Sequence, residues 1–169
     1  CNDDACGGDR SQVVLTLDPG TYTVLVDGHD ASHGGTFGLF FQTAACPVPR
    51  IASNGDTSGN TAGRGNALGG SCGGSRAEED AWYFALCRPT SVTAHTCSSA
   101  TVFDTILYFR TGDCWDTSPE LTCNDDSACP TFARASRVTA TLPKGLSFVV
   151  IDGYDGAAGA YRLNVTGLP

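Results

Sequence analysis

The chain has 169 residues, of which nine are cysteine and 21 glycine, and its formal net charge is −8. Nine cysteines in so short a chain indicate an oxidising compartment, so we expect a secreted or cell-surface protein. An acidic surface repels phosphate backbones, which disfavours a nucleic-acid partner, and no apolar run approaches the length that spans a membrane.

Short segments rich in β-branched and aromatic residues follow one another along the chain. In chain order they are VVLTL (13–17), TYTVLVD (21–27), TFGLFF (36–41), AWYFALC (81–87), SVTAHTC (91–97), FDTILYFR (103–110), RVTATL (137–142), LSFVVID (146–152) and AYRLNV (160–165). Such segments are typical of β-strands, and turns rich in Gly, Pro and Asp separate them. No segment predicts a helix.

The stretch 53–75 carries almost no large apolar side chain. It cannot bury enough surface by itself to offset the entropy lost on ordering. We expect a long surface loop, with a linker between repeats as the alternative, and one or two further strands within 46–70. The strand pattern as a whole predicts an all-β protein, an antiparallel β-sandwich of jelly-roll-like arrangement.

An internal repeat relates the two ends of the chain. Residues 1–43 align with 123–167: CNDD recurs at both starts, and SQVVLTLDPGTYTVLVDGHD (11–30) matches SRVTATLPKGLSFVVIDGYD (136–155). TFGLFFQ (36–42) then matches AYRLNVT (160–166), with only single-residue gaps. We therefore expect residues 46–169 to form one complete repeat, and residues 1–45 to be the C-terminal half of a preceding one.

The half-repeat at 1–45 poses a physical problem. Three apolar strands without a partner sheet are marginally stable and leave strand edges exposed. Either a complementing half exists in the natural protein or a neighbouring chain covers the apolar face. Strand donation between identical chains would build a head-to-tail filament, because such a contact need not close.

Four stretches of the sequence resemble a known domain family. CGGSRAEEDAWYFAL, FDTILYFR, LTCNDDSAC and LSFVVIDGYDGAAGAYRLNVTG are similar to the pre-peptidase C-terminal type of β-sandwich, especially the Cys-rich tandem forms in secreted proteins of myxobacteria and related bacteria. The resemblance covers 72–166 well and 1–42 as the partial copy. It implies an extracellular, non-catalytic module with roles in secretion, substrate or polysaccharide binding and adhesion. The extra cysteines Cys87, Cys97 and Cys129 depart from simpler members.

Acidic residues at three places in the complete repeat form a candidate metal site. Hard oxygen ligands of the kind that Ca²⁺ uses come from Asp104, Asn124, Asp125, Asp126 and Asp152. The competing interpretation is that these Asn and Asp side chains cap tight turns. The first copy retains part of the site, with Asn2, Asp3, Asp4 and Asp27. Calcium is the only cofactor that we expect.

The cysteines are expected to form disulfides. Zinc binding is the alternative, and the absence of a paired CxxC spacing disfavours it. We predict the pairs Cys114–Cys123 and Cys46–Cys72, and leave the other connections open. Asn164 begins an Asn-Val-Thr sequon and is a candidate glycosylation site.

Two functions remain open at this stage. No nucleophile and base stand in a recognisable motif, so we expect no enzyme and no catalytic residue. The first hypothesis is a structural or adhesive repeat that assembles end to end into a surface fibre, with identical chains or adjacent repeats as partners. The alternative is a carbohydrate- or protein-binding accessory module of a secreted enzyme, with surface glycans as its ligands. His29 and His33 are taken as part of a polar loop, because the second copy has Tyr154 in place of His29.

Overall fold

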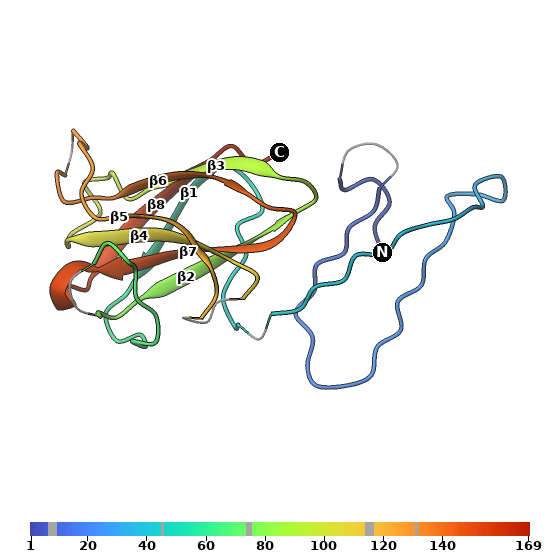
Figure 1. Ribbon diagram of the computed structural model, residues 1–169, viewed down its shortest axis with the longest axis horizontal. Helices are drawn as coiled ribbons and strands as arrows, with labels where there is room; N and C mark the ends of the chain where they lie inside the picture. The colour runs from blue at the N-terminus through green and yellow to red at the C-terminus, as the bar shows by residue number, and fades with distance from the viewer. Residues whose placement is uncertain (7–9, 45, 74–75, 114–116, 131) are drawn as a thin grey trace. The chain divides into compact units, whose positions relative to one another are not determined.

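The computed structural model describes residues 1–6, 10–44, 46–73, 76–113, 117–130 and 132–169. The chain divides into two compact units, Cys1–Gln42 and Thr43–Pro169, each described here by itself. The second unit holds all the strands found among the described residues (Figure 1). They are β1 (Gly55–Asn60), β2 (Asp80–Leu86), β3 (Thr90–His95), β4 (Thr105–Thr111), β5 (Glu120–Asn124), β6 (Arg137–Leu142), β7 (Gly145–Gly153) and β8 (Ala160–Thr166), with a short 3₁₀ turn η1 (Tyr154–Gly156) after β7.

The strands form two four-stranded antiparallel sheets, ordered β1-β8-β3-β6 and β2-β7-β4-β5. This order is that of the jelly roll, an eight-stranded sandwich built from two Greek keys. The predicted all-β antiparallel sandwich is confirmed. Within the described residues, no helix has the length and apolar character that a membrane crossing requires.

The main core lies between the two sheets. In β6 buried and exposed residues alternate: Val138 and Leu142 are buried, while Arg137 and Thr141 are exposed. Strands β4 and β7 are buried on both faces, which explains their nearly continuous apolar sequences. The largest fully buried side chains of the main core include Phe84, Leu107, Phe109, Ile151, Tyr161 and Leu163.

A second apolar cluster covers the outer face of the sheet β2-β7-β4-β5. Ile106, Tyr108 and Val150 project from the sheet and pack against Leu68 and Cys72. The prediction that the glycine-rich stretch 53–75 is a long surface loop is therefore only partly right. Its first part is strand β1, and residues 61–73 form a cover on the sheet.

Two glycines let this cover lie close to the sheet. A Cβ atom at Gly70 would be 2.7 Å from the Tyr108 ring and 2.9 Å from the Cys123 sulfur. At Gly73 a Cβ would be 2.3 Å from the end of the Ile106 side chain. The lack of large side chains, which made the stretch look like a loop, is what allows this close packing.

We expect Gly70→Ala to lower the free energy of unfolding by about 1–3 kcal/mol, the usual cost of overpacking a dense site. The buried Tyr108 ring and the disulfide sulfur of Cys123 have no room to move away from the added methyl group. Urea unfolding followed by tryptophan fluorescence measures the effect. Gly65→Ala is the matched control, since a Cβ there meets nothing within 4 Å. Equal stability of the two variants would contradict the close packing.

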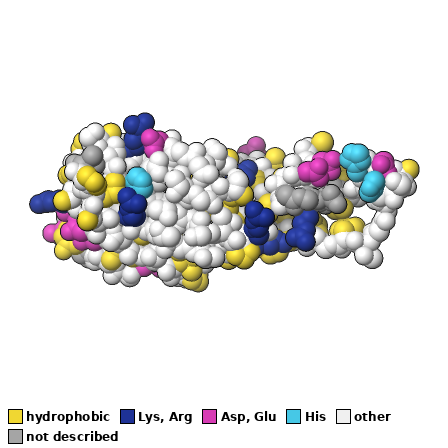
Figure 2. All heavy atoms as spheres, turned by 90° about the horizontal axis from the view of Figure 1, so that it is seen from above, with side chains coloured by type: hydrophobic (Ala, Val, Ile, Leu, Met, Phe, Trp, Pro, Cys, Tyr) yellow, Lys and Arg dark blue, Asp and Glu magenta, His cyan; other side chains and the backbone are white. Residues whose placement is uncertain are grey.

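The first unit differs from its sequence prediction. Its described residues contain no hydrogen-bonded strand, although three were predicted at 13–17, 21–27 and 36–41. Large apolar side chains along all three segments are exposed. Exposed hydrophobic side chains can be seen in yellow on the face of the molecule drawn in Figure 2. A strand is stable only when it pairs with a neighbouring strand, and no such strand pairing is found among the described residues of this unit.

Candidate functional site

Three carboxylates meet at one end of the sandwich. Asp104 directly precedes β4, and Asp125 and Asp126 directly follow β5. Because β4 and β5 are antiparallel neighbours, the start of one lies beside the end of the other. One oxygen atom from each of the three side chains lies within 4.8 Å of the other two. Three of the five predicted calcium ligands thus come together.

The surroundings of these carboxylates disfavour their charge. Partial burial raises the pKa of Asp104 and of Asp125, and the nearby Asp126 carboxylate raises both further. Arg134 Nη1, 3.7 Å from Asp104 Oδ2, offsets part of this repulsion. One buried oxygen of Asp104 and one of Asp125 accept no hydrogen bond from any described residue. A divalent cation with oxygen ligands would satisfy both atoms and relieve the repulsion.

The other two predicted ligands have different surroundings. The Asn124 side chain accepts a hydrogen bond from the backbone N–H of Arg137 at 2.9 Å and donates one to the Asp126 carbonyl at 3.0 Å. Those contacts are the turn chemistry considered as the competing interpretation. Asp152 is not a member of the carboxylate group and is buried beside Tyr108.

Asp152 belongs to a polar cluster on the outer face of the sheet, which the sequence did not predict. Its Oδ1 accepts the backbone N–H of Gly153 at 2.7 Å, and its Oδ2 lies 3.4 Å from the Tyr108 hydroxyl. Burial, the largest cause, raises the pKa of Asp152 to about 6, and the Glu79 carboxylate adds to this increase. Burial also raises the pKa of Glu79, whose Oε1 accepts the backbone N–H groups of Ala67 and Leu68 in the cover.

Arg110 stands in the same cluster and ties three segments together. It is 4% exposed. Its two terminal nitrogens donate to the carbonyls of Ser118 at 2.8 Å and Gly69 at 2.7 Å, and its guanidinium lies 5.3 Å from the centre of the Tyr108 ring. The sequence signal was available, because an arginine ends a run of otherwise buried β4 residues.

A hollow of about 440 Å³ opens beside this cluster. It is lined by Gly69, Gly70, Ser71, Gly73, Arg76, Ile106, Arg110, Ser118, Glu120 and Asp152. Its walls carry both cationic and anionic side chains, so it could accept a polar ligand. Two aromatic side chains that could stack on a sugar, Trp82 and Tyr161, do not line this hollow. Trp82 Nε1 donates to the Tyr161 hydroxyl at 2.9 Å, and that hydroxyl donates to Asp80 at 2.8 Å.

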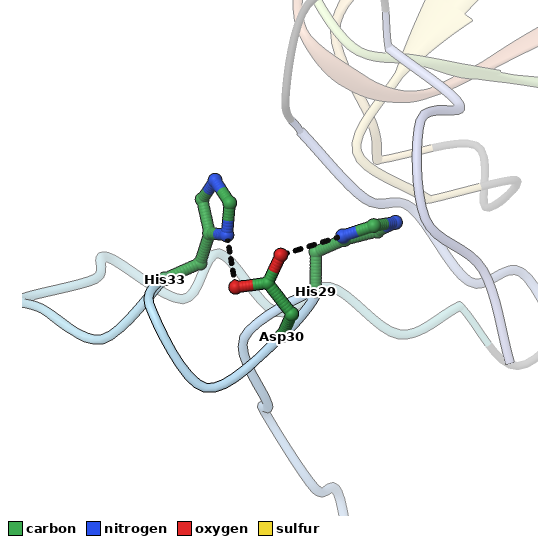
Figure 3. A group of neighbouring side chains, drawn as sticks. All are labelled: His29, Asp30 and His33. Atoms are coloured by element: carbon green, nitrogen blue, oxygen red, sulfur yellow. Dashed lines mark hydrogen bonds and ion pairs between the residues drawn. The ribbon is translucent and has the colours of Figure 1, made fainter.

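In the first unit, two histidines flank one carboxylate (Figure 3). Asp30 Oδ1 lies 2.7 Å from His33 Nδ1, and Oδ2 lies 3.6 Å from His29 Nδ1. A hydrogen bond from the Ser32 hydroxyl, the largest cause, and one from His33 lower the pKa of Asp30 to about 2. The three side chains are exposed and lie close enough to hold a metal ion, but the Ser32 contacts also fit the predicted polar loop.

The partial site of the first copy keeps its turn contacts. Asn2 Oδ1 accepts the backbone N–H of Gln12 at 2.9 Å, and Asp27 accepts the N–H of Gly28 at 2.9 Å. Asp3 Oδ2 lies 3.8 Å from His29 Nε2. Asp3, Asp4 and Asp27 are exposed, and none belongs to a group able to hold a metal ion among the described residues.

The disulfides correct two predictions. Cys72 is bonded to Cys123, and Cys97 is bonded to Cys129. The predicted pairs Cys46–Cys72 and Cys114–Cys123 are therefore wrong, because Cys72 and Cys123 are each other's partners. The cover brings Cys72 onto the outer face of β5, an approach over 51 residues that spacing along the chain does not show. Cys46 is disulfide-bonded, and Cys114 lies outside the described residues.

Asn164, the predicted glycosylation site, lies in β8 and is half-buried. Its side-chain nitrogen donates to Asp56 Oδ1 at 2.6 Å. A glycan on this nitrogen would compete with that contact, so glycosylation of Asn164 stays a prediction.

Comparison with known proteins found similarity among solved structures. No family model matches the chain, and none of the curated proteins matches it. Among solved structures, the chain is similar to the pre-peptidase C-terminal domain of a collagenase from Bacillus anthracis, with 13% sequence identity and a TM-score of 0.46. The match covers 76% of this chain and 100% of that one. It is the domain type that the sequence motifs resemble.

Proposed function

We propose that this protein is a non-catalytic structural or adhesive β-sandwich repeat of the extracellular space, which assembles end to end through its first unit. The observation that carries the proposal is the exposed apolar surface of residues 13–41. The largest side chains on it are Val13, Leu15, Leu17, Tyr22, Val24, Leu25, Val26, Phe37, Leu39, Phe40 and Phe41. Soluble monomers rarely expose a hydrophobic area of this kind without a partner.

The cysteines support the extracellular part of the proposal. Within the described residues, Cys6, Cys46, Cys72, Cys87, Cys97, Cys123 and Cys129 are all disulfide-bonded. Disulfides persist in oxidising environments such as the cell exterior, and they are rare in reducing cytosol. A sandwich held together in this way suits a surface fibre exposed to proteases and changing conditions.

The test is the state of the native, non-reduced material. Electron microscopy should show regular filaments built from repeating units, and intact mass spectrometry should report the mass of one chain after reduction. Single particles containing one chain each would contradict assembly. A variant that carries Leu25→Asp and Leu39→Asp, at exposed positions of the first unit, should then lose filaments while keeping the fold of the second unit.

The alternative is a carbohydrate- or protein-binding accessory module, and the polar hollow beside Arg110 is the observation that favours it. The internal hydrogen bonds of Trp82 and Tyr161 count against a sugar-stacking surface built from these two rings. Binding of soluble oligosaccharides that is lost in a Glu120→Gln variant would support this function over assembly.

We also propose that the carboxylates of Asp104, Asp125 and Asp126 bind Ca²⁺. Extracellular modules bind Ca²⁺ with dissociation constants of about 0.1–1 mM, so about 10 mM Ca²⁺ should stabilise the second unit by about 1.5–3 kcal/mol. Calorimetric melting with and without the ion measures this. Asp104→Asn should abolish the response and, by removing repulsion, stabilise the ion-free protein. A response that survives this substitution would place the ion elsewhere.

A further inference from the structure

The complete unit shows which strands each element of the first unit needs. By the repeat alignment, residues 12–17 correspond to β6, residues 20–28 to β7 and residues 36–42 to β8. In the complete unit β6 pairs with β3, β7 lies between β2 and β4, and β8 lies between β1 and β3. None of β6, β7 and β8 pairs with another of the three. The absence of paired strands in the described part of the first unit follows directly, because all of their partners belong to the other half of a sandwich.

Similar local contacts occur at aligned positions of the two copies. The Asn2 side chain accepts the backbone N–H of Gln12 at 2.9 Å, and Asn124 accepts that of Arg137 at the same distance. The Ser11 hydroxyl donates to the Asp3 carbonyl at 2.5 Å. In the second copy, the equivalent Ser136 hydroxyl donates to the Asp125 carbonyl, also at 2.5 Å.

The glycines after β7 and after its counterpart also correspond. A Cβ at Gly28 would be 2.1 Å from the His33 carbonyl oxygen, and one at Gly153 would be 1.6 Å from that of Ala157. Both glycines also donate their backbone N–H to the preceding aspartate, Asp27 or Asp152. The first unit thus has the local conformations of a sandwich half without the pairing.

Core positions show the same correspondence. Six side chains of the first unit align with core residues that are at most 2% exposed, yet they are themselves 48–67% exposed. They are Val13, Leu17, Val24, Val26, Phe37 and Leu39, opposite Val138, Leu142, Val149, Ile151, Tyr161 and Leu163. Leu25, opposite the buried Val150, is 87% exposed. Val150 packs under the cover formed by residues 61–73, so the partner of the first unit must bring such a cover as well.

We infer that the first unit binds one specific partner, a β1–β5 half of the same domain type, supplied from outside these 169 residues. The inference deepens the proposed assembly by naming what the first unit binds. Residues 12–17 pair with a β3, residues 20–28 insert between a β2 and a β4, and residues 36–42 insert between a β1 and a β3. The chain's own β1–β5 cannot serve, because they already pair with its own β6–β8. The same holds for β1–β5 of a second copy of residues 1–169, so end-to-end assembly through the first unit needs a further, unpaired β1–β5 half.

Cys1 adds a covalent element to this interface. It is a free, exposed thiol, and it aligns with Cys123, which is bonded to Cys72 of the β1–β5 half. The partner half therefore brings a cysteine at the position of Cys72 close to Cys1. The two thiols form a disulfide by giving two protons and two electrons to a disulfide oxidant, which is itself reduced to two thiols.

A fusion protein tests the pairing. A second copy of residues 46–122 is placed directly before Cys1, and the joint regenerates the β5 sequence ELTCN. The protein is refolded with oxidised glutathione, which leaves as two reduced glutathione molecules. We expect amide exchange in residues 20–28 to slow at least about 100-fold relative to the unfused chain, since a paired strand opens far less often than an unpaired one. Peptide mapping without reduction should join Cys1 to the added Cys72.

Matched variants identify the apolar face as the contact. Leu39→Asn in the fusion should abolish the protection, because its counterpart Leu163 is fully buried. Phe40→Asn should preserve it, because the second copy has Asn164 at that position. Phe41 is larger than its counterpart Val165, and its ring could prevent the added half from fitting. The Phe41→Val variant of the fusion removes this obstacle, so the test stays valid.

The outcomes separate this inference from the proposed assembly. Exchange in residues 20–28 that stays fast both in the fusion and in its Phe41→Val variant overturns the inference, as does equal loss of protection in the two asparagine variants. Protection in the fusion together with single native particles would keep the pairing and reject end-to-end assembly. Native filaments with an unprotected fusion would keep assembly and reject this partner.

Discussion

Removal of the Cys72–Cys123 disulfide is expected to lower the free energy of unfolding of the second unit by about 4 kcal/mol. The bond closes 51 residues of chain, so its loss restores much conformational entropy to the unfolded state. It also fastens the cover of residues 61–73 onto β5, over the second apolar cluster. The measurement is urea unfolding of a Cys72→Ala, Cys123→Ala double variant under non-reducing conditions.

The Cys97–Cys129 pair is the control for this experiment. That bond closes 32 residues, so its removal should have a similar entropic cost. Amide exchange then distinguishes the two variants, because only the loss of Cys72–Cys123 should speed exchange in the cover of residues 61–73. A variant without Cys72–Cys123 that retains full protection there would show that the disulfide is not what holds the cover in place.

Asp152→Asn is expected to stabilise the second unit at neutral pH by up to about 3 kcal/mol, from a pKa difference of roughly two units. Burial raises the pKa of Asp152 from 3.8 to about 6, so the folded protein binds this proton more tightly than the unfolded chain. Stability therefore falls as the pH rises from about 4 to about 6, and it stays reduced above that range. The asparagine can still accept the N–H of Gly153.

The pH profile is the decisive measurement for this prediction. Unfolding free energies of the wild type and of Asp152→Asn should agree near pH 4 and separate progressively up to pH 6 to 7. Asp27→Asn changes the equivalent residue of the first unit, whose side chain is exposed, and should leave the profile unchanged. Parallel profiles for the wild type and Asp152→Asn would show that Asp152 is not the titrating group.

The repeat alignment matches Asp3 and Asp4 with Asp125 and Asp126. The turn that brings Asp125 and Asp126 beside Asp104 has the same contacts as the turn at Asp3 and Asp4. In the first unit the counterpart of Asp104 would belong to the partner half. If the first unit finds its partner, a second carboxylate group of the same kind would form at that interface.

The sequence alone determined the fold class, because strand periodicity and turn residues are local properties. The segments 81–87, 91–97, 103–110, 137–142, 146–152 and 160–165 correspond to β2, β3, β4, β6, β7 and β8. It also proposed Asp104, Asp125 and Asp126 for one site, and the structure brings these three carboxylates together. Strand β5, which Asp125 directly follows, was not among the predicted segments. The internal repeat was also found from the amino-acid sequence alone.

Only the tertiary structure decided which distant residues meet. Cys72 is bonded to Cys123. Asp152, which was predicted to be a metal ligand, lies on the outer face of the sheet beside Tyr108. Glycine-rich residues cover that same face. The tertiary structure also showed that β6, β7 and β8 never pair with one another, which is the basis of our proposal that the first unit binds a partner half. These contacts depend on strand order and on the packing of both sheet faces, and neither leaves a periodic signal along the chain.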